Sequence, residues 1–183
     1  MLHWLWPSKS LKEQRRKASD LYGAVVTQAR QPALYSDLGV PDTPTGRYEM
    51  IVLHLVLVLD RLAVEGTEDG ETRRLLIETF VTDLDDTMRE MGVGDLAVPK
   101  RVKRATGALY ERLARYREPL AGGAAGPLSE ILIETAYAGR PPQPMDAAHR
   151  LAQYALEARA ALAAQRAEDL RSGRVRFVPV GAA

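Results

Sequence analysis

The chain has 183 residues and a mass of 20.2 kDa, with 46% apolar and 27% charged residues, proportions typical of a soluble globular protein with one core. It contains no cysteine, which excludes disulfides, thiolate nucleophiles and zinc–cysteine sites. Its 25 lysines and arginines against 24 aspartates and glutamates give a net charge of +1. The overall charge therefore gives no reason to expect nucleic acid or a membrane as the partner.

Residues 1–18 combine an aromatic end with a basic stretch. Both tryptophans, Trp4 and Trp6, lie in the first six residues, and five lysines and arginines against one glutamate follow within residues 9–17. Indole rings prefer the headgroup region of a bilayer, and basic side chains prefer anionic lipid. We therefore expect either a peripheral membrane contact through the two tryptophans or a hydrophobic flap that packs on the domain.

Helical periodicity dominates residues 19–173, where glycine- and proline-rich breaks separate the apolar stripes. The expected helices cover residues 8–30 or 10–30, 32–38, 47–64, 71–91, 100–120, 128–137 and 145–171. The segment 47–64 is apolar on nearly all sides, so we expect it to be the most buried helix. The segment 145–171 is rich in alanine, which favours one continuous helix.

Residues 174–183 follow the last expected helix. Their polarity alternates as in a strand, but a lone strand has no partner in this chain, so we expect an extended tail. The sequence thus predicts an all-α class: a single helical-bundle-like domain of six or seven helices over residues 19–173, with an extended C-terminal tail.

Two neighbouring helices have opposite charge. Residues 65–95 contain ten acids and three bases, whereas residues 99–117 contain seven bases and one acid. On the acidic helix the apolar residues fall on one side and Asp83, Asp86 and Glu90 on the other. Either the two helices neutralise each other across their edges or each presents a docking face. The candidate docking residues are Asp83, Asp86, Glu90, Lys100, Arg101, Lys103 and Arg104.

Catalytic motifs are absent from the sequence: there is no phosphate-binding loop, dinucleotide fingerprint or nucleophile elbow. Two other functions stay open. A metal- or haem-handling enzyme would use the Asp83/Asp86 face or His54 as ligands, although His54 also fits a hydrogen-bonded core position. An RNA-binding regulator would place the basic helix 99–117 on phosphates, although that helix lacks the interleaved aromatic residues of an RNA-reading module.

Two segments of the sequence show a family pattern. The first is LYGAVVTQARQPALY over residues 21–35, which continues through residues 38–42 and 46–50. The second is FVTDLDDTMREMGVGD over residues 80–95, followed by residues 98–103. Together they resemble the ubiquinol–cytochrome c chaperone family, which assists biogenesis of the cytochrome bc1 complex. The similarity extends roughly from Ser19 to Tyr116.

The resemblance implies a non-enzymatic assembly factor, and it offers no catalytic or cofactor-binding residues to transfer. Mitochondrial relatives bind newly made cytochrome b, act with a small partner subunit and associate with the ribosome near the exit tunnel. We expect a bacterial member in the cytoplasm, and a peripheral contact at the cytoplasmic face of the inner membrane stays open. Its client would be cytochrome b or another bc1 subunit; DNA is not an expected partner, and a ribosome or RNA contact stays open.

A chaperone for a membrane protein needs an apolar surface that accepts a helix. Methionine adapts its shape to a ligand, and tyrosine combines an apolar ring with a polar tip. The candidate client-binding residues are Leu21, Tyr22, Val25, Tyr35, Tyr48, Met50, Met88 and Met91. The alternative for each of them is a place in the core, because a helical stripe serves both purposes.

The tryptophan pair gives a direct test of membrane contact, because all indole fluorescence of the protein comes from Trp4 and Trp6. If these rings enter the headgroup region, vesicles with anionic lipid will shift the emission to shorter wavelength. Zwitterionic vesicles serve as the control and are expected to give a smaller shift. Emission that stays unchanged with anionic vesicles would contradict the membrane contact.

Overall fold

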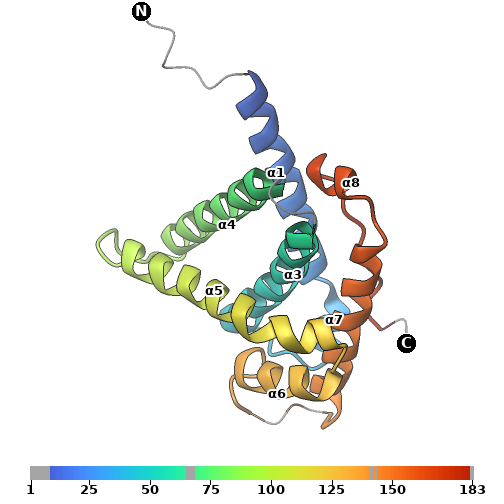
Figure 1. The fold of residues 1–183 in the computed structure, drawn as a ribbon. Coiled ribbons are helices and arrows are strands. Elements are labelled where there is room, and N and C mark those ends of the chain that lie inside the picture. Colours follow the sequence, from blue (N-terminus) through green and yellow to red (C-terminus); the bar gives the residue numbers. More distant parts are fainter. Residues whose placement is uncertain (1–8, 65–68, 141, 143, 182–183) are drawn as a thin grey trace, which may run out of the picture.

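Helix α3 (Pro44–Val64) lies at the centre of the fold, and other helices surround it (Figure 1). Residues 52–59 of this helix are almost completely buried, as the sequence predicts for a segment that is apolar on nearly all sides. Around it lie α1 (Lys9–Ala29), α2 (Pro32–Ser36), α4 (Gly70–Glu90), α5 (Val98–Gly122), α6 (Ala125–Thr135), α7 (Ala147–Ala163) and α8 (Ala167–Arg171). Of these, α1, α4, α5, α7 and α8 pack directly against α3.

The computed structural model describes residues 9–64, 69–140, 142 and 144–181. Within these ranges it contains eight helices, two of them only five residues long, and no strand. The all-α class predicted from the sequence is therefore confirmed. In Figure 1, α4 and α5 meet at one end through residues 91–97 and diverge from there, so that they form a V beside α1 and α3.

The expectation of one alanine-rich helix over residues 145–171 is wrong. The segment forms α7 and α8, with a break at residues 164–166. Arg61 of α3 donates hydrogen bonds from Nε to the Leu162 carbonyl at 3.2 Å and from Nη2 to the Gln165 carbonyl at 2.9 Å. The Leu162 carbonyl belongs to the last turn of α7 and the Gln165 carbonyl to the break, where intrahelical donors run out, and Arg61 binds both. The chain can then turn so that Leu170 of α8 is fully buried.

Residues 174–180 are extended and lie against the helices. Val175, Phe177 and Val178 are partly buried against the core. The Gln165 side chain fixes this tail by accepting from the Arg176 backbone N–H at 2.9 Å and donating to its carbonyl at 2.7 Å. The tail is therefore a packed part of the fold over these residues.

His54 of α3 belongs to a chain of hydrogen bonds that reaches α7 and, through it, α1. Nδ1 lies 2.7 Å from the Met50 carbonyl, and Nε2 lies 2.7 Å from the Tyr154 hydroxyl. A carbonyl only accepts, so Nδ1 holds the proton and Nε2 accepts from Tyr154. The Tyr154 oxygen in turn accepts from Gln28 of α1 at 2.8 Å. Both ring nitrogens thus have hydrogen-bond partners within the protein. This supports a structural role for His54 in the core over a role as a metal or haem ligand.

The neutral state of His54 makes stability depend on pH. Burial lowers its pKa to about 4, from an ordinary value of 6.5. Between about pH 6.5 and pH 4, the imidazole is protonated in the unfolded chain but neutral in the folded chain. The free energy of unfolding therefore falls as the pH drops through this window. The full difference is roughly 3 kcal/mol. Urea unfolding at pH 7 and at pH 4.5 should show the loss.

The variant His54→Gln is expected to be less stable at pH 7 but to lose less stability between pH 7 and pH 4.5. His149→Gln is the matched control, because His149 is exposed. This variant should show the same loss of unfolding free energy between pH 7 and pH 4.5 as the wild type. An equal pH dependence in wild type and His54→Gln would show that His54 does not titrate in this way.

Candidate functional site

A groove of about 730 Å³ opens between α4 and α5. Its floor is apolar and aromatic and comes from α1, α3 and α4, while α5 lines one side. The floor residues are Tyr22, Tyr48, Ile51, Phe80, Leu84 and Met88, and Met91 and Val93 line the groove where α4 joins the segment before α5. We refer to it as the α4–α5 groove.

Phe80 fixes the bottom of the groove. Its ring is fully buried and lies 6.3 Å from the rings of both Tyr22 and Tyr48, edge-on to the first and tilted to the second. Leu84 and Met88 follow Phe80 at intervals of four residues, so they continue along the same side of α4. The apolar stripe predicted for this helix therefore faces partly into the core and partly into the open groove.

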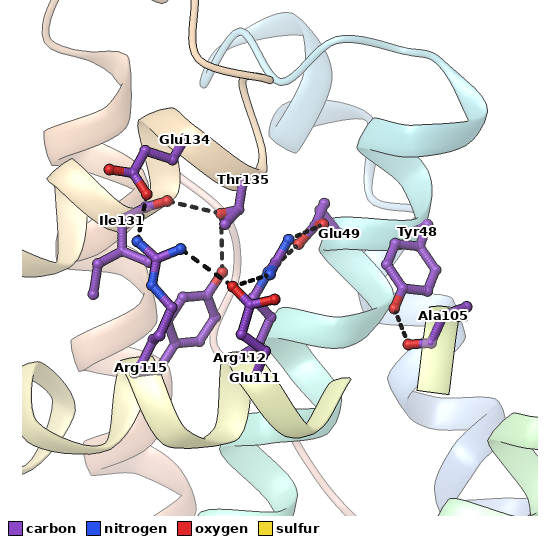
Figure 2. Close-up of polar contacts among 10 residues, drawn as sticks. Tyr48, Glu49, Ala105, Glu111, Arg112, Arg115, Ile131, Glu134 and Thr135 are labelled. Carbon is purple, nitrogen blue, oxygen red and sulfur yellow. Dashed lines mark hydrogen bonds and ion pairs between the residues drawn. The ribbon is translucent and has the colours of Figure 1, made fainter. Parts of the chain in front are cut away.

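Helix α5 is fixed to α3 along the other side of the groove. The Tyr48 hydroxyl donates to the Ala105 carbonyl at 2.6 Å, and Arg112 binds both oxygens of Glu49 at 2.9 and 3.2 Å (Figure 2). Side-chain exposure is 13% for Arg112 and 6% for Glu49, so this ion pair is nearly dry. Burial alone would lower the pKa of Arg112, but the hydrogen bond and charge of Glu49 raise it above its usual value.

The same helix is also joined to α6. Arg115 forms an ion pair with Glu134, and the buried Tyr116 hydroxyl lies 3.1 Å from the Thr135 hydroxyl (Figure 2). These contacts occupy the C-terminal half of α5. The N-terminal half, which begins at Val98, diverges with α4 and forms one side of the groove.

Asp83 lies in the groove, which corrects its assignment to the outer face of α4. The Tyr22 hydroxyl donates to Asp83 Oδ2 at 2.8 Å. Burial, together with the neighbouring carboxylate, raises the pKa of Tyr22 far above its usual value, so the phenol stays protonated and keeps donating. Asp86 and Glu90 are exposed and do not line the groove, as expected for an outer face.

Four arginines contribute to the lining of the groove: Arg30, Arg47, Arg101 and Arg104. All four are exposed residues, so they lie at its edge. Arg47 is paired with Asp42 at 2.6 Å. Arg30, Arg101 and Arg104 make no side-chain hydrogen bond or ion pair with any residue that the structure describes. The edge of the groove is therefore positively charged.

The structure does not bring the eight predicted client-binding residues together. Tyr22, Tyr48, Met88 and Met91 line the α4–α5 groove. Leu21, Val25 and Met50 have no exposed surface, so the structure places them in the core and corrects their assignment to a client surface. Tyr35 is partly buried against the core and donates its hydroxyl to the Ala29 carbonyl at 2.7 Å.

Several groove residues escaped the sequence analysis. Arg30 and Arg47 flank breaks between helices, and only the fold brings them to one groove. Ala105 and Ala108 are small residues on the basic helix, and each follows one of Arg101 and Arg104 by four residues, which places them along the same side. In the sequence, only this helical spacing indicates that the two alanines share a side with the arginines.

The opposite charges of α4 and α5 do not neutralise each other. Within the described parts of both helices, the ion pairs of α4 join Arg74 and Arg89 to acids of α4 or to Asp95, and those of α5 join Arg112 and Arg115 to Glu49, Glu111 and Glu134. Lys100 and Lys103 are exposed and lie outside the groove lining. Each helix thus retains its own field.

The alternative ligand sites gain no support from the geometry. Among residues 9–64, 69–140, 142 and 144–181, no group of three or more His, Asp or Glu side chains is placed to hold a metal ion. None of the helices in these ranges is long and apolar enough to span a bilayer. Trp4 and Trp6 lie outside the described residues, so their membrane contact stays a prediction.

Comparisons with known proteins agree on one family. A family model described as ubiquinol-cytochrome C chaperone matches residues 36–177, which extends well past the segment where the resemblance was seen in the sequence. The crystal structure of the Cbp3 homolog from Brucella abortus is similar, with 31% identity, a TM-score of 0.83 and 95% of each chain covered. A comparison with curated proteins found no match. The chain therefore belongs to the ubiquinol-cytochrome C chaperone family.

Proposed function

We propose that this protein is a chaperone for assembly of the cytochrome bc1 complex, and that it holds newly made cytochrome b, or another bc1 subunit, in the α4–α5 groove. Family membership supports the assembly role. The observation that supports the groove as the client site is its apolar floor, which remains open although residues 52–59 of the neighbouring α3 are covered.

The lining of the groove is better suited to binding a helix than to catalysis. An apolar or amphipathic helix binds by laying a stripe of side chains into a groove of this kind. Each large apolar side chain that leaves water there contributes roughly 1.5–3 kcal/mol. The two carboxylates that line the groove are already engaged, Asp83 by Tyr22 and Glu49 by Arg112. Neither is arranged as a base beside a nucleophile.

Met88 and Met91 make the groove adaptable. Met88 is half-buried and Met91 is 62% exposed. Unbranched methionine side chains can rearrange around client segments of different shape. We propose that the protein acts at the cytoplasmic face of the inner membrane, where Trp4 and Trp6 would hold it near an emerging client.

A substitution in the groove tests the proposed site. Met91→Asp would place a charge where an apolar client side chain packs. It should reduce recovery of cytochrome b with the tagged chaperone about tenfold or more, because a lost apolar contact and a buried charge both oppose binding. The bc1 level in a deletion strain complemented with this variant should fall in parallel.

Met145→Asp is the matched control. Met145 is also exposed, at 82%, and it does not line the groove. This variant should restore both client recovery and the bc1 level. A deletion strain that assembles bc1 at the normal rate would refute the chaperone role, whereas full activity of Met91→Asp would refute the groove as the client site.

A further inference from the structure

The edge of the α4–α5 groove contains three positive charges without a counter-ion in the described chain. Arg101 and Arg104 are three residues apart on α5, so their side chains lie on the same side of the helix. Arg30 comes from the end of α1 and lines the same groove. All three are exposed, and none forms a hydrogen bond or ion pair with a described side chain, unlike Arg47 with Asp42.

These charges act beside an apolar surface. The partly exposed floor residues Tyr48, Leu84 and Met88 would lose contact with water once a ligand covers them. Ionic contacts at the margin of a dry interface are stronger than contacts in open solvent. A groove lined by one sign of charge also attracts the opposite charge during encounter. The site is therefore built for a ligand with an apolar body and negative groups at its border.

The two sides of the groove differ in charge. The Asp83 carboxylate accepts from Tyr22 on the α4 side, so an incoming anion is repelled there and attracted to the arginine edge. A nucleic acid would present phosphates along its whole length and would need exposed aromatic rings for its bases. The rings of Tyr22 and Tyr48 instead pack on Phe80, and their hydroxyls are bound to Asp83 and Ala105.

We propose that the groove selects an apolar helical segment that has acidic residues along the border facing α5, and that Arg101 and Arg104 bind these carboxylates. This inference rests on the proposed function and adds the charge of the client segment to it. The arginines would provide specificity and orientation, while the apolar floor would provide most of the affinity.

Binding of defined peptides to the full chain tests the proposal. The probes are three fluorescent 20-residue leucine–alanine helices that differ only at two positions near one border, where they contain Glu, Gln or Lys. We expect the Glu peptide to bind most tightly and the Lys peptide most weakly. The difference between Glu and Gln should be about fivefold to tenfold in Kd at low salt and should shrink at 300 mM NaCl.

The matched variants are Arg101→Gln with Arg104→Gln, and Lys100→Gln with Lys103→Gln. Both pairs lie on the same turn region of α5 and remove two positive charges, but only the arginines line the groove. The arginine variant should lose the preference for Glu over Gln, and the lysine variant should keep it. Circular dichroism would confirm that both remain helical.

Each other outcome overturns a specific part. If both double variants lost the preference for the Glu peptide equally, binding would depend on net charge alone, and the role of the arginine edge would be overturned. Equal binding of all three peptides, abolished by Met91→Asp, would overturn the acidic border and leave the proposed groove function standing. Binding of haemin, oleate or oligo(U) in place of every peptide would overturn the helical ligand, and normal bc1 assembly without the protein would overturn the proposed function itself.

Discussion

The contact between Glu49 and Arg112 is the interaction on which the geometry of the groove depends most. Helix α3 must be covered because its side chains are apolar on nearly all sides, and α5 provides part of that cover. The bidentate ion pair fixes α5 to α3 near the middle of α5, at 2.9 and 3.2 Å. Removing one partner would leave a buried charge, which typically costs about 3–5 kcal/mol. The N-terminal half of α5 can then diverge with α4 without detaching from the fold.

Because α4 and α5 diverge, the apolar floor of the groove between them stays uncovered. Among the described side chains, no hydrogen bond or ion pair joins α4 to α5, and Arg89 of α4 instead pairs with Asp95 in the segment that connects them. Non-directional packing tolerates small displacements better than a set of hydrogen bonds does. We therefore expect the opening between α4 and α5 to adjust more easily than the contact between α3 and α5, which hydrogen bonds and an ion pair fix.

The sequence predicted the features that follow from periodicity. Helix α3 was recognised because apolar residues on every side of a helix require burial, and the stripe of α4 was recognised by its spacing. Periodicity could not separate a core from an open groove, since Leu21 and Val25 share the pattern of Tyr22 and Met88 yet are fully buried. Asp83 sits next to Leu84 at the border of the stripe, and only its bond to Tyr22 decides which way it faces.

Long-range polar contacts were also beyond reach of the sequence. The alanine-rich segment favours one helix by intrinsic propensity, but Arg61, about a hundred residues earlier in the chain, caps the C-terminus of α7 and permits the break before α8. The partner of a helix terminus cannot be deduced from a local pattern. The same applies to Arg30 and Arg47, whose common position at the groove follows from the packing of α1 and α3.

The polar network and the groove occupy separate parts of the structure. Gln28, His54, Arg61 and Tyr154 join α1, α3 and α7 through directional hydrogen bonds, and none of them lines the groove. Such bonds fix distances between helices, because an unsatisfied buried group is costly. The groove has hydrogen bonds of its own at Tyr22, Tyr48 and Glu49, but its lining also includes methionine and exposed arginine side chains, which move at little cost. A protein that must accept a hydrophobic segment and later release it benefits from this separation, since its ligand can reshape the groove without disturbing the bonds that hold the domain together.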